Sequence, residues 1–108
     1  MKILIVMFFA FFSNVVLAGS GSGNVRIEHV GTFNDKSIVF FYTDQVADKP
    51  ECNTYSGRWT INLNTEVGKA QYSLILAAQA AGAAIRVNGR NTCNLWNNSE
   101  DVHWVGYS

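Results

Sequence analysis

The chain has 108 residues, with 8 lysines and arginines against 8 aspartates and glutamates, which gives a formal net charge of +0 at pH 7. This length suits one small domain, and the balanced charge provides no basic stripe of the kind that binds nucleic acid. The composition therefore favours a single domain that does not bind nucleic acid.

The N-terminal segment has the three parts of a secretory signal peptide. Lys2 precedes an apolar run over residues 3–12, and Val16-Leu17-Ala18 places small residues where cleavage before Gly19 requires them. The apolar run is shorter than the roughly 20 residues that cross a bilayer. The sequence therefore predicts a signal peptide over residues 1–18, no membrane span after its removal, and a secreted or periplasmic product. An uncleaved membrane anchor is the alternative.

The segments after the cleavage site indicate two strands. Residues 19–24 are almost all glycine and serine, so we expect a flexible leader before one domain over residues 25–108. Apolar and polar residues tend to alternate over 25–33, which predicts a half-buried strand. A turn at Asn34-Asp35-Lys36 then leads into residues 37–43, whose aromatic and β-branched side chains predict a strand covered on both faces.

A loop and a helix follow. Residues 44–57 contain the only proline and several turn-forming residues, and residues 58–63 alternate as a third strand does. Asn64-Thr65 is typical of an N-cap, and Gly82 is typical of the residue that ends a helix, so the helix is expected to run to about Ala81. Helical spacing predicts that its buried stripe consists of Val67, Ala70, Leu74, Ile75, Ala78 and Ala81.

Residues 84–88 and 101–107 complete the chain as the fourth and fifth strands. The fold is therefore predicted to be mainly β with one helix, in the order β-β-β-α-β-β. This order, with the helix between strands three and four, matches the five-stranded OB-fold barrel.

Cys52 and Cys93 both lie beyond the leader, and two thiols in a small exported domain are expected to form a disulfide. A catalytic Cys–His–Asp set could be drawn from Cys93, His103 and Asp101, but a nucleophilic thiol must be free. Glu100 and Asp101 are neighbours on a predicted strand, so they point to opposite faces and do not form an acid–base pair. We therefore expect no catalytic residues and no enzyme activity.

The two histidines do not indicate a metal site. His29 and His103 are far apart in the sequence, and no HxxxH or CxxC spacing occurs. His29 shares the alternation of Ile27 and is expected to face the core as a structural residue. We expect no metal and no cofactor.

Trp96, Asn97 and Asn98 combine a flat apolar ring with neutral amides. Sugar recognition uses such a ring against the apolar face of a pyranose and amides for its hydroxyls. In the alternative interpretation, Trp96 fills the end of the barrel and the asparagines only turn the chain. These residues alone leave both interpretations open.

The second half of the chain contains three segments in this order: residues 59–63 (WTINL), the predicted strand around Ile85-Arg86-Val87 after the helix, and residues 93–98 (CNLWNN). This order resembles that of the B subunits of cholera-toxin-type bacterial toxins, in which a Cys-x-Trp-Asn-Asn segment is one residue shorter. Residues 82–87 (GAAIRV) are similar to the Gly-x-x-Val-Arg-Ile segment of subtilase-cytotoxin-type B subunits.

The resemblance implies an OB-fold subunit that forms a ring of five, binds a cell-surface glycan and delivers a separate toxin A chain. It implies that Trp96 stacks on a terminal sugar and that Asn98 bonds one of its hydroxyls, with Asn97 between them. Asn62 stands where the cholera-toxin type has a glutamate of its galactose site, and Ser99 stands where that type has a lysine. The region that holds sialic acid in the subtilase type corresponds in position to Asn34, Asp35, Lys36 and Ser37.

The leading hypothesis is a secreted, non-enzymatic, glycan-binding domain of the toxin B-subunit type, with Trp96, Asn97, Asn98 and Asn62 as its binding residues and a homopentamer as its assembly. The main alternative is a secreted or periplasmic OB-fold interaction or inhibitor module that is monomeric and binds no sugar.

Overall fold

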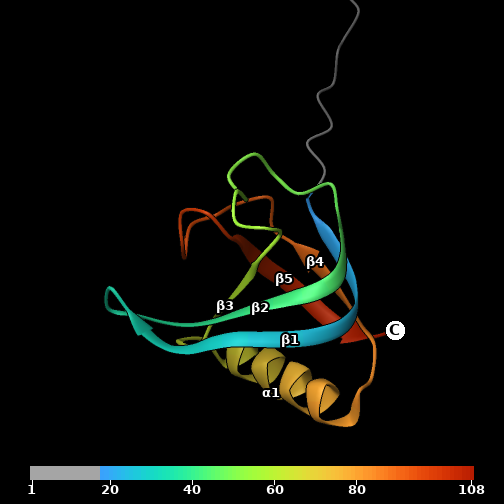
Figure 1. Cartoon of the computed structure of the whole chain (residues 1–108). Helices are drawn as coiled ribbons and strands as arrows, with labels where there is room; N and C mark the ends of the chain where they lie inside the picture. Colours follow the sequence, from blue (N-terminus) through green and yellow to red (C-terminus); the bar gives the residue numbers. More distant parts are fainter. Residues whose placement is uncertain (1–17) are drawn as a thin grey trace, which may run out of the picture.

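The computed structural model describes residues 18–108, so the signal peptide predicted over residues 1–18 lies outside the described residues except for Ala18. The described chain is mainly β with one helix, as predicted (Figure 1). Its elements are β1 (Ser20–Phe33), β2 (Lys36–Ala47), β3 (Trp59–Asn62), α1 (Glu66–Ala81), β4 (Ile85–Gly89) and β5 (Glu100–Tyr107).

The five strands form one sheet that closes on itself through hydrogen bonds, in the order β1-β2-β3-β5-β4. All neighbouring strands are antiparallel except β3 and β5, which run parallel where Trp59 faces Glu100 and Thr60 faces Asp101. Helix α1 lies beside β1 (Figure 1) and also contacts β3 and β5. The β3–β5 contact places the start of β5 beside the loops before β3 and after β4, where the predicted functional residues lie.

The predicted flexible leader is wrong, because β1 begins at Ser20. Residues 20–23 pair with β4, from Ser20 opposite Asn88 to Gly23 opposite Ile85, and so complete the ring. Backbone pairing needs no side chains, and the small residues make room: a methyl group on Gly21 would lie 2.5 Å from the Thr43 hydroxyl. Glycine and serine here serve close packing, whereas their composition alone indicated a linker.

The turn predicted between the first two strands is confirmed. Asn34 and Asp35 have left-handed backbone angles, with φ of 49° and 64°, which suit the tight turn of a hairpin. The second strand continues past the predicted end at Thr43 to Ala47, so the following loop is shorter than expected. Its centre is covered on both faces, as predicted, with four consecutive buried residues: Ile38, Val39, Phe40 and Phe41.

Helix α1 has the predicted ends. Gly68 N–H donates to the N-cap hydroxyl of Thr65 at 2.9 Å, and Gly82 ends the helix with a left-handed φ of 66°. The buried stripe is correct in part, because Ile75 and Ala78 are fully buried but Val67 is 62% exposed. The residue buried in the first turn is Gly68, which packs against the Asn62 carbonyl so closely that a methyl group would collide with it. No helix within residues 18–108 has the length and apolarity needed to cross a membrane.

The core fills the inside of the ring between the strands and the inner face of α1. Every strand contributes to it, and Trp59 is its largest fully buried side chain. The buried members are Val25, Val39, Phe41, Trp59, Ile61, Ile75, Ala78, Ile85, Val87 and Val102. Phe40 points to the opposite face of β2 and belongs to the candidate site instead.

Candidate functional site

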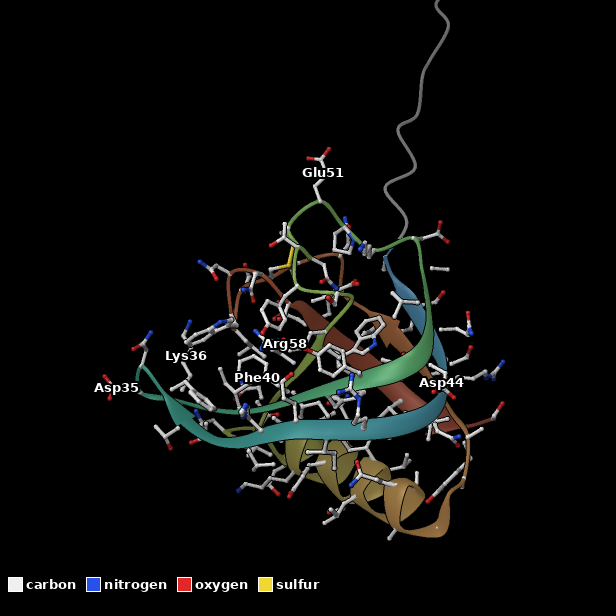
Figure 2. The ribbon with its side chains drawn as sticks, viewed as in Figure 1. Asp35, Lys36, Phe40, Asp44, Glu51 and Arg58 are labelled. Carbon is white, nitrogen blue, oxygen red and sulfur yellow. A yellow bond between two sulfur atoms is a disulfide. The ribbon has the colours of Figure 1, made fainter. Side chains whose placement is uncertain are left out.

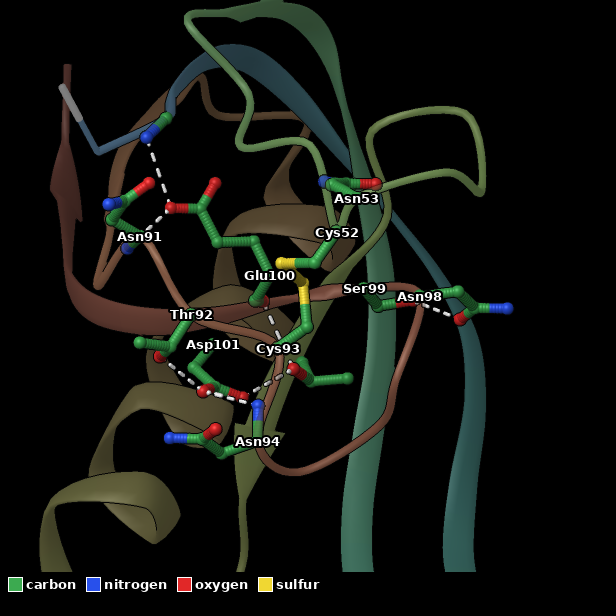
Figure 3. The surroundings of a disulfide bond; sticks show 12 residues. Cys52, Asn53, Asn91, Thr92, Cys93, Asn94, Asn98, Ser99, Glu100 and Asp101 are labelled. Atoms are coloured by element: carbon green, nitrogen blue, oxygen red, sulfur yellow. Dashed lines mark hydrogen bonds between the residues drawn. A yellow bond between two sulfur atoms is a disulfide. The ribbon is translucent and has the colours of Figure 1, made fainter. Parts of the chain in front are cut away.

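The predicted disulfide is confirmed: Cys52 and Cys93 are bonded, with their α-carbons 6.0 Å apart (Figure 3). It joins the loop before β3 to the loop between β4 and β5. A backbone hydrogen bond from Thr54 N to Asn98 O, at 3.2 Å, holds the same two loops together. With both cysteines oxidised, neither can act as a nucleophile.

Asp101 holds the segment after the disulfide in place. Its carboxylate accepts hydrogen bonds from the Thr92 hydroxyl at 2.6 Å and from the backbone N–H groups of Asn94 at 2.9 Å and Leu95 at 3.1 Å. The Thr60 hydroxyl lies 3.4 Å from the same carboxylate. Asp101 is only 5% exposed, so these bonds are shielded from water and fix the shape of residues 92–95.

Trp96 is partly buried, and its ring packs against the β1–β2 hairpin. Its ring meets Phe33 edge-on with centroids 5.9 Å apart, and Phe40 with centroids 5.7 Å apart. The remainder of its surface lines an open hollow of about 270 Å³. Trp96 therefore packs against the hairpin and also lines the hollow, and its role in sugar binding stays a prediction.

The hollow joins the loop after β4 to the tip of the β1–β2 hairpin. Its lining residues are Asn34, Lys36, Cys93, Asn94, Leu95, Trp96 and Asn97. Lys36 Nζ donates to the carbonyl oxygens of Asn94 at 3.2 Å and Leu95 at 3.3 Å, which ties the hairpin to the loop. Figure 2 shows Lys36 near the tip of the hairpin and, further along β2, Phe40 beside Arg58. Of the four residues that correspond in position to the sialic-acid region of the subtilase type, Asn34 and Lys36 line the same hollow as Trp96, whereas Asp35 and Ser37 are not among its lining residues.

Two of the predicted binding residues do not line this hollow. The Asn98 side-chain carbonyl accepts from Arg58 Nη2 and from the Ser99 hydroxyl, both at 3.0 Å, so it supports the loop. The Asn62 side chain caps the following turn by accepting from Asn64 N–H at 2.9 Å. Asn62 lines a separate hollow of about 300 Å³ between the start of α1 and the loop after β4. The structure therefore brings together Trp96 and Asn97, without Asn98 or Asn62.

Arg58 is the central support of the site and was interpreted from the sequence only as the start of a strand. Its side chain is 8% exposed. The guanidinium donates to the Ser99 hydroxyl at 2.8 Å, to Glu28 Oε1 at 3.0 Å and to Asn98 at 3.0 Å. One buried cation thus connects β1, the start of β3 and the loop before β5. Nothing local in the sequence marks this role, since its three partners are far away along the chain.

The same guanidinium lies between two aromatic rings, 4.0 Å from the centroid of Phe40 and 4.1 Å from that of Tyr55. Hydrogen bonds from Tyr42 and then Arg58 lower the pKa of Glu28, against the opposing effect of burial. Burial, followed by the bond to Glu28, raises the pKa of Tyr42 to about 12. At neutral pH the carboxylate is therefore charged and the phenol neutral, so the cluster has a balanced pair of charges.

His29 does not face the core as expected, because its side chain is 56% exposed. A register shift between Ile27 and His29 breaks the alternation from which its position was predicted. His103 is also exposed. Within residues 18–108, no group of three or more histidine, cysteine or carboxylate side chains is arranged to hold a metal ion.

Comparison with known proteins assigns no relative. No protein-family model matches the chain, and no curated protein or solved structure matches it. The disulfide is compatible with an extracellular or periplasmic location.

Proposed function

We propose that this protein is a secreted, non-enzymatic glycan-binding domain whose sugar lies in the hollow lined by Trp96, Asn97, Asn34 and Lys36. One observation carries the proposal: an indole, neutral amides and a lysine from two distant segments line one open hollow. An aromatic ring with nearby amides is suited to a sugar, which has an apolar face and many hydroxyls.

The rigidity of the hollow supports the same function. The disulfide, the Asp101 hydrogen bonds and the Lys36 contacts fix the loop before any ligand arrives. A preformed site loses little conformational entropy on binding, which matters for sugars because their single-site affinity is low. Lys36 uses two of its three donors on carbonyl groups, so one N–H remains for a ligand hydroxyl or carboxylate.

We further propose that the closed sheet is an OB-type barrel and that the protein belongs to the toxin B-subunit class. The strand ring β1-β2-β3-β5-β4, with the helix between β3 and β4, supports this fold. In that class, a homopentamer would strengthen weak sugar binding through multivalency, and a toxin A chain would be its cargo. The departure is that Asn62 and Asn98 lie outside the hollow, so the sugar would be held by Asn97 and the hairpin tip.

A glycan array probed with the disulfide-intact protein tests the proposal. We expect binding to fall at least about tenfold, or roughly 1.4 kcal/mol, in Asn97→Ala, whose exposed side chain lines the hollow. Trp96→Ala should lose more, because it removes the ring that lines the hollow. Tyr107→Ala is the matched control, since this aromatic side chain is 54% exposed on β5 and outside the hollow. Unchanged binding in folded Asn97→Ala and Trp96→Ala would contradict the site.

A second function, that of a protein-interaction module, is favoured by an apolar groove between α1 and β5. Val67 and Trp104 are exposed there, and the groove holds about 280 Å³. Its remaining lining residues are Ala70, Gln71, Leu74, His103 and Val105. Exposed apolar surface of this kind is used in contacts between proteins.

Light scattering after size exclusion separates the two functions. The glycan-binding B-subunit proposal expects an assembly several times the mass of one chain, whereas the interaction module is expected as a monomer. If the protein elutes as a monomer and gives no signal on the glycan array, the interaction module is the better description. An assembly that Val67→Ser with Trp104→Ser dissociates would show that the groove forms the contact between subunits.

A further inference from the structure

The carboxylate of Glu100, the first residue of β5, is closed off from solvent, with 0% of the residue exposed. Its Oε2 accepts from the backbone nitrogen of Gly19 at 3.0 Å and from that of Asn91 at 2.9 Å (Figure 3). Its Oε1 has no hydrogen-bond partner among residues 18–108, and none of the salt bridges found there includes Glu100. A buried carboxylate is thus held by two neutral donors.

The backbone closes on this carboxylate from two sides. A methyl group on Gly19 or on Gly89 would collide with the Glu100 oxygens, so a larger residue at either position would displace the carboxylate. Gly89 N–H also donates to the Gly19 carbonyl at 2.8 Å. Gly19 is therefore held at its nitrogen by Glu100 and at its oxygen by β4, directly before β1 begins.

Among residues 18–108, no positively charged group forms a salt bridge with the Glu100 carboxylate. Burial raises the pKa of Glu100, the bonds from Asn91 and Gly19 act in the opposite direction, and the neighbouring Asp101 charge raises it further. A buried charge is stable only when an opposite charge or enough hydrogen bonds accompany it. A peptide nitrogen supplies one proton and no charge, whereas an α-ammonium group supplies three protons and a full positive charge.

The sequence predicts independently where such a group arises. The cleavage pattern of Val16-Leu17-Ala18 makes Gly19 the first residue of the exported protein. Gly19 is also the residue whose nitrogen contacts the buried carboxylate. Gly19 and Glu100 are 81 residues apart in the sequence. The hydrogen bond between the Gly19 nitrogen and the Glu100 carboxylate is therefore a product of the whole fold and not of local structure.

We propose that cleavage of the Ala18–Gly19 bond creates the group that Glu100 is placed to hold, so that the α-ammonium of Gly19 forms a buried ion pair with Glu100 and locks β1 into the ring. In this hydrolysis by a signal peptidase, the amide C–N bond breaks and the water oxygen joins the Ala18 carbonyl carbon. Both water protons end on the Gly19 nitrogen, which leaves a carboxylate on Ala18 and an ammonium on Gly19. The inference rests on the proposed export of the chain and is independent of glycan binding.

The first experiment exports the full chain from a bacterial host and reads the N-terminus of the product by mass spectrometry. We expect a mature chain that begins at Gly19. A product that begins at any other residue would overturn the proposal, whatever the protein binds, because no ammonium would then lie at Glu100.

The second experiment compares the melting temperature of three forms: the mature chain, the same chain with Ala18 in front of Gly19, and the mature chain with its Gly19 amine acetylated. These chains keep every strand and the helix. We expect both altered forms to melt at least about 5 °C lower, a large shift for a domain of this size. In Glu100→Gln the Gly19 and Ala18 starts should melt within about 2 °C of each other, since the ion pair is absent from both.

Equal melting temperatures for the three Glu100 forms would overturn the proposal. The proposal would also be overturned if, in Glu100→Gln, the melting temperatures of the Gly19 and Ala18 starts differed by as much as they do with Glu100 present. If Glu100→Gln does not fold, acetylation still removes the charge without altering Glu100, and the mature and acetylated forms decide the question. None of these measurements uses a glycan, so a failure here is separate from a failure of the proposed sugar site.

Discussion

Replacing both Cys52 and Cys93 by serine is expected to lower the free energy of unfolding by about 4 kcal/mol, since the bridge closes a loop of 41 residues' separation that the unfolded chain would otherwise sample freely. Without the bridge, the folded protein still has the Thr54–Asn98 backbone bond and the Arg58 bonds to Asn98 and Ser99 between the same two loops. These bonds act in the folded state and do not restrict the unfolded chain, so they do not replace the bridge. Urea unfolding, with its midpoint and slope compared between the two proteins, measures the loss.

Reduction of the unaltered protein provides the control. The reduced protein should unfold at the same urea concentration as the double serine variant, because both lack the bridge and differ only at two sulfur atoms. Glycan binding should also weaken at temperatures where the variant is still folded, since Cys93 lines the hollow. A midpoint unchanged by reduction would show that the bridge does not stabilise the fold.

Local features of the fold were predictable from the sequence because short-range chemistry determines them. The hairpin turn follows from Asn34 and Asp35, which tolerate left-handed angles, and the helix ends follow from Thr65 and Gly82. The disulfide followed from cysteine count and compartment. The turn and the helix ends depend on residues that are close together in the sequence. The disulfide joins distant residues, but with only two cysteines in the chain each has one possible partner.

Features that depend on distant contacts were missed. The pairing of residues 20–23 with β4 closes the ring, but glycine and serine carry no apolar pattern from which pairing could be predicted. The register shift before His29 moves that side chain outward, and nothing in the alternation around it marks the shift. Both errors arise from backbone geometry that side-chain periodicity does not record.

Only the part of the candidate site formed by residues adjacent in the sequence could be predicted. Trp96 and Asn97 are neighbours in the chain, so they were expected to act together, and they line one hollow. Arg58, which holds Glu28, Asn98 and Ser99 together, gains its importance only when three segments meet. Asp101 was considered as an acid or base, but its actual contacts are with the loop that precedes it.

Removing the Asp101 carboxylate is expected to produce the second large loss of stability. In Asp101→Ala the Thr92 hydroxyl and the N–H groups of Asn94 and Leu95 lose a buried acceptor at once. Each unsatisfied buried donor costs about 1–3 kcal/mol, although the loop can expose some of them to water. We therefore expect a loss of about 3 kcal/mol or more, measured by urea unfolding.

The same variant separates a structural role from a general effect of charge. Hydrogen exchange at Asn94 and Leu95 should accelerate in Asp101→Ala before the rest of the chain opens, because these amides lose their acceptor. Glu51→Ala is the matched control: this carboxylate is exposed on the loop before β3 (Figure 2), and its removal should change stability by less than about 0.5 kcal/mol. Equal losses in the two variants would show that Asp101 does not anchor the loop. A selective loss would show that Asp101 holds residues 92–95 in the wall of the proposed sugar site, whereas the adjacent Glu100 carboxylate contacts Gly19 and Asn91.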